Sequence, residues 1–376
     1  MKILVLCYEY PPVGGGGGRV AAQVAAALAA RGHQVIVHTS GMPHLPRSEE
    51  RDGVRIVRTR CFRRREDTCS VPEMAAYVLA GFFPAWWLAR REKPDVIHAH
   101  FAVPTGALAF AVSQLTGVPY VLTAHLGDVP GGVPEQTAHL FRLVDPVARI
   151  FWKTATRVTA VSAFVTGLAR RAYGVEPVTI RNGIPLRAMA HPPQAHARPR
   201  LVLVGRLSVQ KNPLLAVRAL ALVRDLDWSL DVIGEGPLGA ELRTEVATLG
   251  LADRVTFHGW LAGDAVGTLM DRSDILLMTS LHEGLPMVGV EALQHGLAVI
   301  GSAIGGLQDV VEEGKNGFLC PFEPAAFAGR LREVLSDPAL LTRLRQGSRA
   351  LAARFDLEDS VAAYETVLQD ASGRVE

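Results

Sequence analysis

Short apolar runs alternate with amphipathic stretches along the chain. In the first half, amphipathic segments such as Val20–Ala30 and Thr105–Leu115 predict helices, and the apolar runs between such segments predict buried strands. The expected strands are Ile3–Cys7, Gln34–His38, Val54–Arg58, Val96–His98, Tyr120–Thr123 and Arg157–Val161. Strands that alternate with helices indicate a parallel sheet with helices on its faces.

The pattern breaks at Arg187–Arg200, a proline-rich stretch without periodicity that predicts a linker. A second series of strands follows at Leu201–Val204, Ser229–Ile233, Val255–Phe257, Ile275–Met278 and Ala298–Ile300. We therefore predict an α/β protein with two Rossmann-like, doubly wound domains that face a cleft, at residues 1–186 and 201–355. A last helix at about 356–376 is expected to pack back on the first domain.

Composition narrows the class of protein. Of the 376 residues, 49% are hydrophobic and 20% charged, which excludes wholesale disorder, and the net charge of +2 disfavours a nucleic-acid partner. The four cysteines form no CxxC pair, so a reducing cytoplasm is expected. The longest apolar run, residues 75–89, is shorter than the ~20 residues that span a bilayer. The sequence thus predicts a soluble or peripheral protein.

Charge is distributed unevenly between the two halves. Residues 1–190 carry 22 Lys and Arg against 13 Asp and Glu, whereas the remainder is acidic. A basic first half indicates a polyanionic surface or substrate on that side, although a drift in surface charge would give the same asymmetry.

Five glycines, Gly14–Gly18, follow the first predicted strand and precede a helix expected from Val20. Glycines let the backbone approach a ligand, and the helix start adds N–H groups that attract anions. The loop is expected to hold a phosphate or a sugar hydroxyl; the alternative is a flexible loop without a ligand.

A second loop, Gly234–Gly239, matches the GxGxxG pattern of dinucleotide-binding enzymes. That fingerprint needs an acidic residue at the end of the following strand to hold the ribose. Here the strand ends in Phe257-His258-Gly259-Trp260, so hydride chemistry is disfavoured.

Two glutamates, Glu283 and Glu291, stand eight positions apart, and a helix is expected to begin near Met287 between them. Upstream, Arg206 and Lys211 follow a strand, where two cations suit a diphosphate, although two surface cations are the simpler alternative. No metal site is predicted, since the HExxH zinc pattern fails and Asp225-Leu226-Asp227 is interpreted as a surface turn.

These pieces together resemble the retaining, nucleotide-sugar-dependent glycosyltransferases of the GT-B fold, family 4 (glycosyl transferases group 1). The matching motifs cover most of the chain. They include Pro11-Pro12 with the glycine loop, Arg31-Gly32-His33, Pro94–His100, Thr123-Ala124-His125 with Asp128, Ala160-Val161-Ser162, Asn182-Gly183-Ile184, Gly205-Arg206-Leu207 with Lys211, Ile233–Pro237 and the Glu283–Glu291 pair.

The resemblance implies a role for each matching residue, with no cofactor and no metal. The implied catalytic residues are His125 beside the sugar, Arg206 and Lys211 at the departing diphosphate, and Glu283 on the sugar hydroxyls. The implied donor-binding residues are Gly15, Gly16, Gly234, Gly236, His258, Leu285, Pro286, Met287, Val288 and Glu291, the last on the ribose. The implied acceptor-binding residues are Arg19, His100 and Asp128. The family's usual H-G-x-D reads His125-Leu126-Gly127-Asp128 here, and Pro286 lacks the N–H of the usual residue.

The implied reaction moves a sugar from a nucleotide diphosphate sugar to a glycan, lipid-linked or small-molecule acceptor, by same-face attack that retains the anomeric configuration. Polysaccharide or glycolipid biosynthesis is one setting. Arginines at 58–65 and aromatic residues in Tyr77–Leu88 suggest an anionic membrane surface, such as the inner face of the cell membrane; the alternative is a buried helix beside a solvated basic loop. A sugar-nucleotide-binding protein without transfer, an epimerase and a phosphorylase remain as rivals, the last disfavoured by the scarcity of lysines in the second half.

Overall fold

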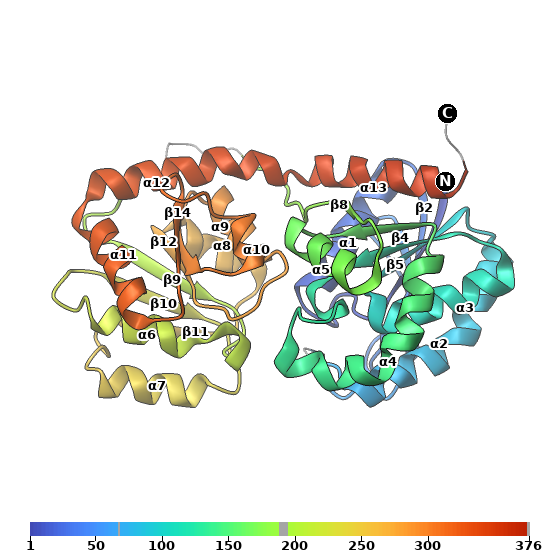
Figure 1. Cartoon of the computed structure of the whole chain (residues 1–376), viewed down its shortest axis with the longest axis horizontal. Coiled ribbons are helices and arrows are strands. Elements are labelled where there is room, and N and C mark those ends of the chain that lie inside the picture. The colour runs from blue at the N-terminus through green and yellow to red at the C-terminus, as the bar shows by residue number, and fades with distance from the viewer. Residues whose placement is uncertain (67, 188–194, 374–376) are drawn as a thin grey trace. The chain divides into compact units, whose positions relative to one another are not determined.

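The computed structural model describes residues 1–66, 68–187 and 195–373 (Figure 1). The chain divides into two compact units, one formed by Met1–Gly183 with Leu357–Glu376 and the other by Ile184–Asp356. The sequence placed a linker at 187–200, and residues 188–194 of that stretch lie outside the described residues.

Unit 1 contains an eight-stranded sheet in the order β3-β4-β2-β1-β5-β6-β7-β8. Neighbouring strands pair in parallel except β3 and β4, which are antiparallel. The strands are β1 (Lys2–Cys7), β2 (Gln34–Gly41), β3 (Ser48–Arg51), β4 (Val54–Arg60), β5 (Val96–His100), β6 (Tyr120–Ala124), β7 (Arg157–Ala160) and β8 (Val178–Thr179). The two edge strands, β3 and β8, were not predicted from the sequence.

Helices cover the sheet of unit 1. Strand β1 is buried from Ile3 to Cys7 without alternation, as expected for a central parallel strand with both faces covered. The helices are α1 (Gly16–Ala30), α2 (Val71–Glu92), α3 (Ala107–Thr116), α4 (Pro134–Thr154), α5 (Ala163–Tyr173) and α13 (Leu357–Ala371), with a π-helical turn at Ala102–Gly106 and a 3-10 turn at Leu126–Asp128.

Helix α13 lies at the C-terminal end of the chain and belongs to unit 1 (Figure 1). Its Tyr364 is fully buried, with its ring 5.3 Å from that of His98 on β5. On the surface, Arg31 pairs with Glu358 and Glu365 of this helix. Apolar burial and surface ion pairs therefore both attach α13 to the sheet and to the end of α1.

Unit 2 contains a six-stranded parallel sheet in the order β11-β10-β9-β12-β13-β14. Its strands are β9 (Arg200–Val204), β10 (Ser229–Ile233), β11 (Val255–Gly259), β12 (Ile275–Met278), β13 (Ala298–Ser302) and β14 (Gly317–Cys320). Five of them match predicted runs, and the edge strand β14 was missed. The helices are α6 (Pro213–Ala221), α7 (Gly239–Thr248), α8 (Gly263–Asp271), α9 (Met287–Gln294), α10 (Gly305–Gln308), α11 (Pro324–Ser336) and α12 (Pro338–Ala352), with 3-10 turns at Val209–Lys211 and Ala353–Phe355.

Alternate residues of the central strands β9 and β12 enter separate apolar clusters. Leu201 and Leu203 of β9 pack into a cluster with Trp228 and Phe327, whereas Val202 packs into another with Met270. This period of two places one cluster on each face of the sheet. Both halves of the chain are thus doubly wound α/β units, as the sequence predicted.

Strand order reverses once in the middle of each sheet. In unit 1 the reversal lies between β1 and β5, and in unit 2 between β9 and β12. Loops that leave such a pair of strands diverge to opposite faces, and the crevice between them is the usual ligand site of open α/β sheets. Chemistry is therefore expected after β1 and β5, and after β9 and β12.

Candidate active site

The reversal in unit 2 brings a cation and a carboxylate together. Lys211, in the turn after β9, places its Nζ atom 2.6 Å from Oε1 of Glu283, in the loop after β12. The Glu283 side chain is only 10% exposed and that of Lys211 25%. The cation is thus held in a defined position, and Arg206 lies exposed a few residues upstream.

Several hydrogen bonds attach the loop of Glu283 to the turn of Lys211. The amide Nε2 of Gln210 donates to the carbonyl of His282 at 3.0 Å, and the backbone N–H of Leu281 donates to the carbonyl of Gln210 at 2.8 Å. The hydroxyl of Thr279 donates to the carbonyl of Asn212 at 2.9 Å. Because these bonds fix both backbones, the pair is organised before any ligand arrives.

Helix α9 begins at Met287, as predicted, directly after the Glu283 loop. Pro286 is the residue before the helix, and its carbonyl accepts from the N–H groups of Gly289 and Val290. The earlier amides, at Met287 and Val288, belong to the helix start that attracts anions. Glu291 follows one turn later and is half-buried. Leu285, also predicted to border the donor, is buried.

The predicted donor glycines of the second loop have a structural explanation. A Cβ atom at Gly234 would overlap the carbonyl oxygen of Gly205, and one at Gly236 would overlap that of Leu207. Both glycines also adopt positive φ angles of 125° and 159°. They are required by close backbone packing, so their contact with a donor stays a prediction. Nearby, Nε2 of His258 lies 2.6 Å from Oδ1 of Asp231.

The glycine loop of unit 1 differs from the prediction at its end. Helix α1 begins at Gly16, not near Val20, so Gly16–Gly18 form its first turn. The N–H of Gly15 donates to Oε2 of Glu9 at 3.0 Å. A carboxylate already lies against an amide that was expected to meet a phosphate. Gly15 itself has open space around its Cα, with no atom within 4 Å of a built Cβ.

His125 and Asp128 lie at the end of β6, and both are buried. Oδ2 of Asp128 accepts from the backbone N–H of His125 at 2.7 Å. Burial lowers the pKa of His125 to about 4, so its imidazole is neutral at physiological pH. Burial likewise raises the pKa of Asp128 to about 7, against the backbone N–H groups that favour its ionised form.

His100 is fully buried beneath His125, with ring centroids 5.8 Å apart. Burial first, and then the neighbouring His98 and His125, lower its pKa well below the ordinary value. In this conformation the side chains of His100 and Asp128 are both buried and cannot contact an acceptor. Their predicted contact with the acceptor would require the fold to open.

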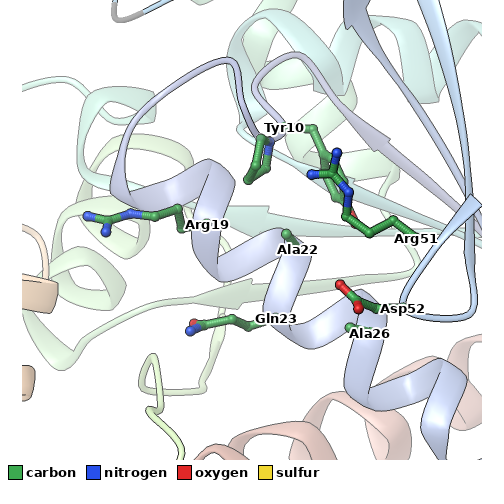
Figure 2. Close-up of a pocket in the computed structure, with 8 residues that line it drawn as sticks. Tyr10, Arg19, Ala22, Gln23, Ala26, Arg51 and Asp52 are labelled. Atoms are coloured by element: carbon green, nitrogen blue, oxygen red, sulfur yellow. The ribbon is translucent and has the colours of Figure 1, made fainter. Parts of the chain in front are cut away.

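Arg19, the third predicted acceptor residue, is exposed on α1 and lines a surface pocket of about 270 Å³. Figure 2 shows Arg19 and Gln23 projecting from the helix, with Arg51 at the end of β3 and Asp52 in the turn that leads to β4. Tyr10 forms part of the wall. Two guanidinium groups, one carboxylate and one amide are among the groups that line this pocket.

The arginines of residues 58–65 do not form one surface cluster. Arg58 and Arg63 are buried, and their guanidinium groups bond to Glu49 and to backbone carbonyls of the fold. Arg60, Arg64 and Arg65 are exposed. Three of the five are therefore on the surface, and the membrane contact expected of this stretch stays a prediction. In the described parts of the chain, the helices are all too short or too polar to cross a bilayer.

Comparison with known families supplies the class. A model described as "Glycosyltransferase Family 4" matches residues 14–188, and one described as "Glycosyl transferases group 1" matches residues 189–351. The 2-deoxystreptamine glucosyltransferase of Streptomyces kanamyceticus is 32% identical over 91% of this chain and 96% of its own length. The chain therefore belongs to the family 4 glycosyltransferases of the GT-B fold.

Other proteins that align with nearly the whole chain have different names. The N-acetyl-alpha-D-glucosaminyl L-malate synthase of Bacillus anthracis is 27% identical over 98% of this chain and 97% of its own. Among solved structures, a sucrose-phosphate synthase from Thermosynechococcus elongatus aligns over 100% of both chains with a TM-score of 0.85 and 23% identity. Anabaena HepE in complex with UDP aligns over 98% of this chain and 100% of its own, with a TM-score of 0.76 and 22% identity.

Proposed function

We propose that the protein transfers a sugar from a nucleotide diphosphate sugar to an acceptor hydroxyl, with retention of the anomeric configuration and without a metal ion. The observation that carries the proposal is the Lys211–Glu283 pair at the strand reversal of unit 2, in a chain of this family. The solved complexes of HepE with UDP and with UDP-glucose support a nucleotide-sugar donor.

Charge explains the role of the cations. When the bond between sugar and diphosphate breaks, negative charge grows on the leaving group and positive charge on the sugar. Lys211 is held beside the reversal and Arg206 is exposed close to it in sequence, so both can meet the diphosphate as its charge develops. The two cations would supply the stabilisation that a divalent ion would otherwise give. Glu283 orients Lys211 and can accept hydrogen bonds from sugar hydroxyls.

Retention follows if the acceptor attacks the face that the diphosphate leaves. In that route the departing phosphate oxygen takes the proton of the attacking hydroxyl, and no enzyme nucleophile is needed. His125 is neutral, so it can share a hydrogen bond with a sugar hydroxyl without adding a positive charge beside the developing oxocarbenium ion. Its Nε2 atom is buried and has no hydrogen-bond partner among the described residues.

The acceptor is proposed to be a polar hydroxyl compound that reaches Arg19. The relatives' names include 2-deoxystreptamine, L-malate and inositol 3-phosphate, which are small and rich in hydrogen-bonding groups. The Arg19 pocket, whose lining includes Arg51, Asp52 and Gln23, is the proposed place for part of such a molecule. A glycan or lipid-linked acceptor would extend beyond it.

The reaction is tested by incubating the protein with UDP-, GDP- and ADP-sugars and a panel of cyclitol, dicarboxylate and lipid-linked acceptors, in buffer with a chelator. The expected result is a glycoside whose anomeric proton shows the donor's configuration by NMR. An inverted product would contradict retention, and loss of turnover in chelator would contradict metal independence. Release of an epimerised sugar nucleotide without acceptor would favour the epimerase alternative.

We also propose that helix α2 lies against an anionic lipid surface on the cytoplasmic side of a membrane. Leu79, Phe83 and Trp87 follow each other at intervals of four along α2, and their side chains are 79%, 64% and 42% exposed. Phe62, in the preceding loop, is 88% exposed. Residues four apart are neighbours on a helix, so the three form one apolar ridge.

Cations flank this ridge at both ends. Arg90 and Arg91 lie in the last turn of the helix, with the guanidinium of Arg91 4.9 Å from the Trp87 ring, and Arg60, Arg64 and Arg65 are exposed before the helix begins. Apolar residues between arginines complement the acyl boundary and phosphate groups of an anionic bilayer.

Co-sedimentation with phosphatidylglycerol vesicles tests this surface. Binding is expected for the wild type and should weaken with salt and in the double variant Leu79→Ser/Phe83→Ser. Leu115→Ser, which changes an exposed leucine of α3, should bind like the wild type. Equal binding to neutral phosphatidylcholine vesicles, or no binding at all, would contradict the proposal.

A further inference from the structure

Phe101, directly after β5, has a backbone conformation that bulky residues rarely adopt. Its φ is +69° and its ψ is 109°. An aromatic residue with positive φ costs free energy and persists only where its surroundings fix it, most often at a functional site. Here its N–H donates to the carbonyl of Thr123 at 3.1 Å, and its carbonyl accepts from the N–H of Gly106 at 3.2 Å.

This conformation places the Phe101 ring against His125. The two rings are stacked, with centroids 4.2 Å apart and planes inclined by 23°. On another side, the ring meets Tyr8 edge-on, with centroids 4.9 Å apart and planes at 74°. The stack leaves the His125 imidazole little freedom to rotate.

The same ring also contacts the start of α1. A Cβ atom at Gly17 would lie 2.5 Å from Cζ of Phe101 and 3.2 Å from Nδ1 of His125. Only a residue without a side chain fits there. Phe101 therefore lies between the first turn of α1, which follows the glycine loop, and the histidine at the end of β6.

Asp128 connects the backbones of these segments. Its Oδ2 accepts from the N–H of His125 at 2.7 Å, and its Oδ1 accepts from the N–H of Val103 at 3.2 Å. One buried carboxylate thus fixes the chain on both sides of the stacked rings. Two strand ends and a helix start meet in one rigid group at the strand reversal of unit 1.

We infer that Phe101 is a positioning residue for sugar transfer: its ring fixes the orientation of the His125 imidazole and the position of the glycine loop. The inference rests on the proposed function, in which His125 shares a hydrogen bond with the sugar. Phe101 touches no reacting atom in this account and acts through His125. Loss of its ring should misplace the imidazole and slow the transfer step, while the diphosphate still binds to Arg206 and Lys211.

The test compares Phe101→Leu with Phe110→Leu, which shortens a partly buried phenylalanine of α3 in the same unit. A ring stacked on His125 shifts the imidazole protons upfield in NMR, and Phe101→Leu should abolish that shift. Its kcat is expected to fall about 100-fold, as for a catalytic group displaced by about 1 Å, and the Kd for nucleoside diphosphate, which Arg206 and Lys211 are proposed to set, should change far less. Phe110→Leu should change neither kcat nor the shift.

A double-mutant cycle with Gly17→Ala makes the test independent of folding defects. The added methyl collides most closely with Phe101, and leucine removes that collision while the 3.2 Å approach to Nδ1 of His125 stays, so Gly17→Ala should impair the wild type more than the Phe101→Leu variant. Additive effects, an unchanged His125 resonance in Phe101→Leu, or an unchanged kcat would each overturn the inference. Absence of transfer by the wild type would refute the proposed function instead, and the His125 resonance would still decide whether Phe101 orients the ring.

Discussion

Lys211 and Glu283 are 72 positions apart in sequence and meet at 2.6 Å between Nζ and Oε1. They leave the carboxyl ends of β9 and β12, the neighbouring strands at which the sheet order of unit 2 reverses. The ammonium group is thereby held in place before a donor arrives. A cation that is already in position stabilises the negative charge that develops on a leaving group without a further cost of reorganisation.

Lys211→Ala should lower kcat by about 100- to 1000-fold, because it removes one preorganised charge from the departing diphosphate. It also leaves the Glu283 carboxylate without its cation. Steady-state kinetics at saturating donor measure the effect. The matched control is Lys315→Ala, which removes a surface lysine paired with Glu312 in the same unit and should keep full activity. A fall of similar size in both variants would contradict the assignment.

Glu291→Ala should weaken nucleotide binding by about 10- to 100-fold, the loss expected when charged hydrogen bonds to a ribose are removed. Glu291 lies within α9, one turn after the helix start. Calorimetric titration with nucleoside diphosphate gives the affinity. Glu241→Ala, at an exposed position of α7, serves as the control. Unchanged affinity in Glu291→Ala would show that the ribose lies elsewhere.

Two glycines should respond differently to the same substitution. Gly15→Ala meets open space at a negative φ, so the melting temperature should stay at the wild-type value while transfer falls because the methyl group intrudes on the donor. Gly234→Ala collides with the backbone of Gly205 and should destabilise unit 2 with or without ligand. Thermal melts and donor kinetics together separate the two cases. Full activity of Gly15→Ala would remove this residue from the donor site.

Acid should destabilise unit 1. Burial lowers the pKa of His38 and His125 to about 4 and that of His98 to about 3, from 6.5 when unfolded. At pH values between the lowered pKa values and 6.5, the unfolded chain binds more protons than the folded chain. The free energy of unfolding therefore decreases as pH falls from about 6.5 toward 4. Each imidazole contributes a slope of about 1.4 kcal/mol per pH unit.

Asp128 opposes this trend. Its pKa is raised from 3.8 to about 7, so the folded chain holds the extra proton in that window and this carboxyl favours folding at the acidic end. Urea unfolding at several pH values between about 4 and 6.5 gives the slope of the free energy of unfolding against pH. This slope should be smaller by about 1.4 kcal/mol per pH unit in His98→Asn than in the wild type. An identical slope in both proteins would show that His98 is not buried in its neutral form.

The sequence predicted the central strands because buried parallel strands are continuous apolar runs, as in Ile3–Cys7 and Ile275–Met278. It missed β3, β8 and β14, which are edge strands of two to four residues with weak patterning. The start of α1 was misplaced because glycines were interpreted as a loop, whereas Gly17 enters the helix to make room for Phe101.

The site residues likewise divide into those that the sequence predicted and those that it missed. The cation and carboxylate of unit 2 were identified from their positions after strands, but their direct pairing depends on the fold. The buried state of Arg63 was invisible in a run of arginines, since its partners include the distant carbonyl of Tyr8. Phe101 carried no signal in the sequence, because its role depends on a backbone angle and on two residues far along the chain.

The central claim is that Arg206 and Lys211 receive the diphosphate of the donor. The most direct test compares the binding of UDP and of uridine to the wild type and to Arg206→Ala/Lys211→Ala by calorimetry, in chelator; GDP or ADP with its nucleoside replaces them if it stabilises the protein more. The account predicts that the double variant loses most of its affinity for the diphosphate and keeps that for the nucleoside. Diphosphate binding of wild-type strength in the double variant would contradict it.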